Sequence, residues 1–224
     1  MATEATRDAL IDLNGVPPSE QANLSVTQTP NGTLVTNNGN VQGFTAFVTR
    51  TAEFTGGRFS ASNFNFSNPS GGQPNIGLRD TEAYNSNFNG TTSNDGLSFG
   101  GNNPLAKSTI RTRISGARAS LGNGEDSVTF LKGTKDSKSS YNLGAGADSI
   151  TFGKGSLSNK TSVSLGRNDG AADIVDIANK NSVKKLRIND FGVNDTLRVG
   201  SKTYDYNDLE AKGGKLGNIS ISFD

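Results

Sequence analysis

Two aspartates recur at a fixed spacing in the second half of the chain, in a setting that suits ligands of a hard cation. Asp126 and Asp148 each follow a glycine-rich turn, with Gly124 and Gly146 two residues before them. A carboxylate supplies negative charge, and glycine lets the backbone turn its carbonyl oxygens towards an ion. Two such turns could share one ion if they lie side by side. In the alternative, the aspartates and glycines only shape the turns and bind no ion.

The spacing comes from an internal repeat of 22 residues. The segment 121–130, LGNGEDSVTF, returns as 143–152, LGAGADSITF, and a third, altered copy begins at Leu165. A fixed period of this size is typical of stacked supersecondary units. Each copy holds a turn and a short strand with alternating residues, so we predict a parallel β-solenoid with 22-residue coils and two short strands in each coil.

The first two copies resemble the nonapeptide repeat GGxGxDxUx of RTX calcium-binding β-rolls. The matching segments are 124–128, GEDSV, and 146–150, GADSI, and the run 188–197, INDFGVNDTL, also looks like segments that follow RTX repeats. The resemblance covers about half of the chain. It implies calcium as the cofactor, with Asp126 and Asp148 as carboxylate ligands in turns that contain Gly124 and Gly146.

The composition limits the chemistry that this chain can carry out. The chain has 224 residues and no Cys or His, which excludes disulfides, thiolate metal sites and the commonest general base. No phosphate-binding loop, zinc motif or nucleophile elbow is present, so we expect no enzyme. We also expect no transmembrane helix, because no run of about 18 apolar residues exists. The first residues, MATEATRDALIDLNG, lack an apolar core, so we expect no Sec signal peptide.

We expect an all-β chain in four parts. Residues 1–20 form an N-terminal arm, with a short helix from Thr6 to Leu13 or a disordered terminus in its place. Residues 21–106 form a β-rich assembly domain, residues 107–187 the solenoid, and residues 188–224 strands that cap it. The boundary lies where the charge changes, because residues 1–106 carry four Arg against eight acids, and residues 107–224 carry 18 basic residues against 13 acids.

Within these parts the alternation of apolar residues predicts individual strands. A hairpin around Pro30-Asn31-Gly32 and one long strand from Phe44 to Phe54 are expected in the N-terminal half. The expected solenoid strands are Ala117–Leu121, Ser127–Phe130, Ser139–Leu143, Ser149–Phe152, Thr161–Leu165 and Ile174–Ile177. The residues expected to point inward are Leu121, Val128, Phe130, Leu143, Ile150, Phe152, Leu165 and Ile174.

The N-terminal half has the character of an interface. No residue from Gln21 to Thr49 is charged, and eight of the twelve Phe lie before residue 100. Charge is depleted at the cores of interfaces, so we expect residues 1–100 to dock on other virion or surface-layer proteins and to form a homo-oligomer, for which we take a trimer. A small β-sandwich with ordinary loops is the alternative.

Lysines recur with the repeat and predict a charged ladder. Lys132 and Lys154, and likewise Lys138 and Lys160, should stack on one face. Such a ladder could bind an anionic glycan. No aromatic residue stands among these lysines, so we expect no nucleic-acid partner; the alternative is a solvated face without a ligand.

These features predict a non-enzymatic structural protein displayed on a surface. We expect a phage virion component at the virion surface, a capsid decoration or fibre-type protein, which docks by its N-terminal region. The alternative is a secreted RTX-like calcium-binding adhesin or surface-layer protein, exported to the extracellular space without a signal peptide.

Overall fold

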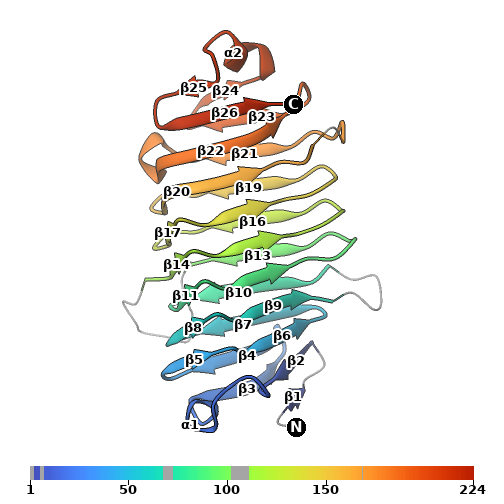
Figure 1. Cartoon of the computed structure of the whole chain (residues 1–224), viewed down its shortest axis with the longest axis vertical. Helices are drawn as coiled ribbons and strands as arrows, with labels where there is room; N and C mark the ends of the chain where they lie inside the picture. Colours follow the sequence, from blue (N-terminus) through green and yellow to red (C-terminus); the bar gives the residue numbers. More distant parts are fainter. Residues whose placement is uncertain (1–2, 6–7, 68–72, 102–110, 168) are drawn as a thin grey trace.

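A parallel β-solenoid of about seven coils makes up the computed structural model of this chain (Figure 1). The structure describes residues 3–5, 8–67, 73–101, 111–167 and 169–224. Each coil contributes strands to three faces, and successive coils stack in parallel along the long axis of the molecule. The predicted all-β solenoid is therefore confirmed, although it is longer than the repeat in the sequence indicates.

The first face is a ten-stranded sheet. Its strands are β3 Leu24–Thr29, β4 Gly32–Asn37, β7 Thr51–Thr55, β10 Asn75–Arg79, β13 Gly96–Phe99, β16 Ser127–Phe130, β19 Ser149–Phe152, β21 Ile174–Ile177, β23 Thr196–Val199 and β24 Lys202–Tyr204. Neighbours pair in parallel except at the two ends, where β3 pairs antiparallel with β4 and β24 with β23. The pair β3–β4 is the hairpin predicted around Asn31.

The second and third faces belong to one sheet that bends at a corner. The second face holds β5 Asn40–Gln42, β8 Arg58–Ser60, β11 Glu82–Tyr84, β14 Arg113–Ser115 and β17 Lys135–Ser137. The third face holds β1 Thr3–Ala5, β2 Ala9–Asp12, β6 Thr45–Val48, β9 Asn63–Phe66, β12 Asn87–Asn89, β15 Arg118–Ser120, β18 Ser140–Asn142, β25 Lys215–Leu216 and β26 Ile219–Phe223. Two long strands, β20 Leu157–Ser164 and β22 Val183–Phe191, pair on both faces.

The corner between the second and third faces needs a backbone that L-residues rarely adopt. In six successive coils, one residue at this corner has a positive φ between 47° and 71°. These residues are Gly43, Ala61, Asn85, Gly116, Lys138 and Lys160. The corner divides each coil into three strands where the sequence predicted two, because β17 and its equivalents are short and carry polar outer residues.

The core is a narrow strip of side chains that stack from coil to coil. Phe99, Phe130 and Phe152 occupy one register position of the first face, and the rings of Phe130 and Phe152 are parallel with centroids 4.9 Å apart. Seven of the eight residues predicted to point inward are buried. Ile174 is the exception, because the buried residues of β21 are Val175 and Ile177, and Ile174 takes the outward position of Ser149.

The predicted division into two domains does not match the sheets. The boundary near residue 106 lies within residues 102–110, outside the described residues. On either side of it, β13 pairs in parallel with β16, and β11 with β14. Coils before and after the boundary therefore share two continuous sheets, and residues 32–67 and 73–101 belong to the same solenoid as residues 111–167 and 169–191. The expected long strand from Phe44 to Phe54 is likewise divided between β6 and β7 on different faces.

The N-terminal arm is a strand where a helix was expected. Ala9, Ile11 and Leu13 are buried while Leu10 is exposed, which is the period of a strand. β2 pairs antiparallel with β6, and β1 pairs antiparallel with β2 at the edge of the third face. A short helix, α1 Pro18–Gln21, follows this strand, and the expected helix residues Thr6 and Arg7 lie outside the described residues.

The phenylalanines of the N-terminal half fill the core and do not form an interface. Of the eight, only Phe47 is exposed, and the other seven are at most 5% exposed. Phe44, Phe54, Phe59 and Phe64 pack edge-on with ring centroids 4.9–5.9 Å apart. The abundance of Phe in this half therefore does not mark a docking surface, because narrow coils need bulky side chains to fill them.

The C-terminal segment caps the solenoid as predicted. β26 extends the third face by parallel pairing with β22, and β24 folds back on β23. Two short helical elements were not predicted from the sequence: α2 Tyr206–Glu210, which begins at a capping box of Asp205 and Asp208, and the 3-10 turn η1 Lys180–Ser182. Both α2 and α1 are far too short to span a membrane, and the described residues contain no other α-helix.

Candidate functional site

A column of buried aspartates follows the corner where the third face leads into the first. The column has five members, of which the sequence analysis found two. The members are Asp95, Asp126, Asp148, Asp173 and Asp195. All five precede a first-face strand in the pattern Asp-x-apolar-x-apolar, and this signal could have revealed the other three. We call this column the aspartate ladder.

Each rung of the ladder joins two coils through a hydrogen bond to the backbone. The N–H of Asp126 donates to Oδ1 of Asp148 at 2.7 Å, and the N–H of Asp148 donates to Oδ1 of Asp173 at 2.8 Å. The rungs from Asp95 and Asp173 have the same geometry. The chain passes from the third face to the first here, so this N–H has no carbonyl partner in a neighbouring strand. The carboxylate of the next coil accepts its hydrogen bond instead.

The second carboxylate oxygen distinguishes the middle of the ladder from its ends. Oδ2 of Asp95 accepts the N–H of Thr91 at 2.6 Å, and Oδ2 of Asp195 accepts the N–H of Gly192 at 2.7 Å. Oδ2 of Asp126 and Oδ2 of Asp148 are buried without a hydrogen-bond partner among the described residues. A buried oxygen without a partner is costly, so these two atoms mark where a proton or a cation would be bound.

The ladder disfavours the ionised form of its carboxyl groups. Burial raises the pKa of Asp126 and of Asp148 to about 7 and that of Asp173 to about 8. Charges on neighbouring acids raise these pKa values further, and the backbone N–H donors oppose the rise. We therefore expect Asp126, Asp148 and Asp173 to hold protons up to about neutral pH when no cation is bound.

The predicted glycines lie in the turns that stack beside the ladder. Gly124 and Gly146 have φ values of 128° and 129°, and a Cβ on Gly146 would stand 1.8 Å from the carbonyl oxygen of Gly124. The N–H of Gly146 donates to the carboxylate of Asp169 at 3.0 Å. The structure thus brings all four predicted site residues into adjacent coils. Among the described residues, no three acidic side chains form a group able to hold a metal.

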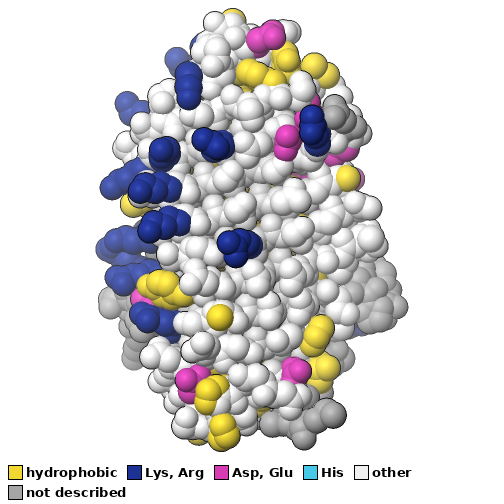
Figure 2. Space-filling model, viewed as in Figure 1, with side chains coloured by type: hydrophobic (Ala, Val, Ile, Leu, Met, Phe, Trp, Pro, Cys, Tyr) yellow, Lys and Arg dark blue, Asp and Glu magenta, His cyan; other side chains and the backbone are white. Residues whose placement is uncertain are grey.

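A second feature is a basic surface on the second face. Figure 2 shows Lys and Arg gathered along the flank on which Figure 1 labels β8, β11, β14 and β17. Eight exposed lysines lie in the last three coils here, on segments 131–139, 153–161 and 178–186. They are Lys132, Lys135, Lys138, Lys154, Lys160, Lys180, Lys184 and Lys185, which we call the lysine surface. The predicted pairs Lys132–Lys154 and Lys138–Lys160 fall in neighbouring coils within it.

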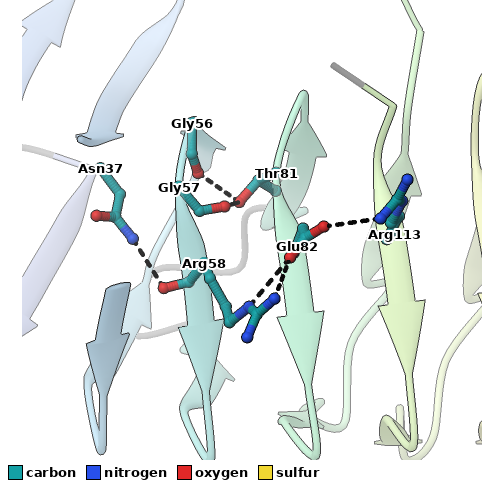
Figure 3. Close-up of polar contacts among 7 residues, drawn as sticks. All are labelled: Asn37, Gly56, Gly57, Arg58, Thr81, Glu82 and Arg113. Atoms are coloured by element: carbon teal, nitrogen blue, oxygen red, sulfur yellow. Dashed lines mark hydrogen bonds and ion pairs between the residues drawn. The ribbon is translucent and has the colours of Figure 1, made fainter. Parts of the chain in front are cut away.

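One glutamate pairs with two arginines beside the N-terminal edge of the lysine surface. Figure 3 shows Glu82 between Arg58 and Arg113, which come from the strands on either side of β11. Its carboxylate accepts bonds from Arg58 at 2.8 and 3.0 Å and from Arg113 at 3.3 Å. The described ion pairs involve Arg only, so none of the eight lysines has an acidic partner among the described residues.

Comparisons of the chain with models of known families, with curated proteins and with solved structures found no match.

Proposed function

We propose that this chain is a non-enzymatic structural protein displayed on a surface, attached at the N-terminal end of its solenoid. The observation that supports this most is an exposed apolar pair at that end. Leu10 and Phe47 stand opposite each other on β2 and β6, and they are 42% and 39% exposed. The other large apolar residue exposed in the described chain, Val193, lies near the C-terminal end.

The narrower form of the proposal is a phage virion component at the virion surface, a capsid decoration or fibre-type protein. It would contact other virion proteins through residues 1–100 and form a homo-oligomer, with a trimer as the proposed state. A stack of coils with a continuous hydrophobic core is stiff along its axis, which suits a protein that projects from a surface. Attachment at one end leaves the lysine surface facing solvent.

We expect the apolar pair to hold copies of the chain together. Replacing Leu10 and Phe47 by Ser removes apolar contact area at the proposed interface but leaves the core intact, so the variant should stay monomeric where the unmodified chain associates. Sedimentation of the full chain over a range of concentrations measures this. Val193→Ser at the other end is the matched control and should associate normally. Two results would contradict association through the N-terminal end: an unmodified chain that is monomeric, or a loss of association in the Val193→Ser control alone.

The alternative is a secreted RTX-like calcium-binding adhesin or surface-layer protein, exported without a signal peptide. What supports it is the pair of unpartnered oxygens on Asp126 and Asp148. Calcium is a hard cation that takes carboxylate and carbonyl oxygens, and it would offset the charge of the ladder. The residues to hold it would be Asp126 and Asp148, with carbonyl groups of the turns at Gly124 and Gly146.

If calcium binds there, it should raise the melting temperature through these two carboxylates. A ligand that binds only the folded state stabilises it by about 3 kcal/mol at a hundred times its dissociation constant. Melting curves at neutral pH with calcium and with chelator measure the effect. Asp148→Asn should abolish it, and magnesium serves as the control for general ionic effects. Identical curves with calcium and chelator would leave the aspartates with a purely structural role.

A further inference from the structure

A shallow groove of about 290 Å³ crosses the second face within the lysine surface. Arg113, Lys135 and Lys184 border it with positive charge, and Tyr84 and Leu157 add apolar surface. These residues come from five adjacent strands, β11, β14, β17, β20 and β22. At ~4.8 Å between strands the groove extends for roughly 19 Å along the solenoid axis.

Two of the three cations along the groove, Lys135 and Lys184, have no acidic partner among the described residues, whereas Arg113 shares Glu82 with Arg58. The one acid on β17, Asp136, turns inward and is 2% exposed. It accepts hydrogen bonds from Tyr141 at 3.2 Å and from Thr161 at 2.5 Å, and burial raises its pKa. It therefore adds little negative charge to the surface above it.

The lysines of neighbouring coils repel one another. Their strands are ~4.8 Å apart, which is less than the screening length of about 8 Å at physiological salt. An anion with charges repeated along its length would relieve this repulsion at several coils at once. The geometry therefore favours an extended polyanion that lies parallel to the solenoid axis over a single small anion.

The chemistry around the groove favours a sugar polymer over a nucleic acid. Tyr84 is the only aromatic residue that lines it, and its ring is already covered by the guanidinium of Arg58, 4.6 Å from the centroid. Binding of single strands relies on successive bases stacked on aromatic rings. The adjacent third face offers short uncharged groups, such as Asn142 and Ser164 at equivalent positions, which suit hydroxyl groups.

We propose that this groove and the surrounding lysine surface bind a linear anionic polysaccharide, with its acid groups beside Arg113, Lys135 and Lys184. The lysines act as point charges, and the carboxylates or sulfates of the polymer pair with several of them in turn. This proposal goes beyond the structural role and holds whichever end attaches the chain to a surface.

Binding of a polygalacturonate hexamer to the full chain tests this proposal. Titration calorimetry at low salt should detect binding that weakens as salt is raised, and uncharged dextran should not bind. Lys135→Gln with Lys184→Gln should weaken binding by about tenfold, as two surface charge pairs of ~0.7 kcal/mol each imply. Lys202→Gln with Lys212→Gln in the cap removes the same charge elsewhere and should change affinity less than about twofold.

Three results would overturn the proposal. The first is no binding of the hexamer at low salt. The second is equal weakening by the two double variants, which would show that only net charge matters. The third is tighter binding of an oligothymidylate of equal charge, which would favour a nucleic acid. Melting curves of both double variants should match those of the unmodified chain, since all four lysines are exposed.

Discussion

Gly146→Ala should lower the free energy of unfolding by about 3 kcal/mol or more. The alanine would have a strained φ, and its Cβ would overlap the backbone of the neighbouring coil. The backbone of Gly146 has a φ of 129°, and its missing Cβ would stand 1.8 Å from the carbonyl oxygen of Gly124 in the coil before. That atom belongs to a backbone fixed by its own neighbours, so the coils must move apart. Denaturant unfolding of the full chain measures the change.

Gly133→Ala separates the two causes. Gly133 also has a positive φ, 89°, but a Cβ there would meet nothing within 4 Å. It should therefore cost only about 1 kcal/mol, the backbone term alone. If both variants unfold at the same denaturant concentration, close stacking of the glycine turns is not what limits stability.

Stability should fall by on the order of 5–10 kcal/mol between about pH 5 and about pH 9, measured with chelator present, because the folded state holds protons that the unfolded state releases. The pKa values of Asp126 and Asp148 are raised to about 7 and that of Asp173 to about 8. A raised pKa gives stability that is complete below the ordinary pKa of aspartate and is lost progressively until pH has passed the raised values of about 7 to 8. The loss should therefore be steepest between about pH 5 and about pH 7 and should level off above about pH 8.

Asp148→Asn is the variant that identifies the ladder as the cause. An amide keeps an oxygen to accept the N–H of Asp126 and cannot ionise, so the dependence on pH should become weaker. Glu210→Gln, which removes an exposed acid of α2 that does not contribute to the raised pKa values of the ladder, is the control and should leave the dependence unchanged. A stability that rises from about pH 5 to about pH 9 in chelator would contradict the buried, proton-holding ladder.

The sequence predicted the solenoid only where residue types repeat, and the physical reason is that most of a coil is free to vary. The residues with positive φ at the corner between the second and third faces include Gly43, Ala61, Asn85 and Lys138, so no common residue type marks this corner in the sequence. Coil length varies too. Val35 and Phe54 are 19 residues apart at one register position, and Phe99 and Phe130 are 31 apart. An alternation of buried residues survives such changes, whereas a fixed period does not.

The candidate site was predicted in part. Asp126 and Asp148 were found because glycine turns precede both, but Asp95 and Asp173 follow other residues and were missed. Sequence spacing cannot tell that a carboxylate turns inward to replace a strand hydrogen bond. The lysine pairs were predicted to stack, yet the groove beside them depends on β14, β17 and β22 lying side by side, which only the fold establishes.

The central claim is that the N-terminal end of the solenoid is attached and the rest projects. A photoreactive phenylalanine analogue in place of Phe47, in the full chain within its native assembly, tests this directly. We expect cross-links from position 47 to another surface protein or to a second copy of the chain. The same analogue in place of Val193, at the opposite end, should give none. Cross-links from position 193 alone would contradict the account.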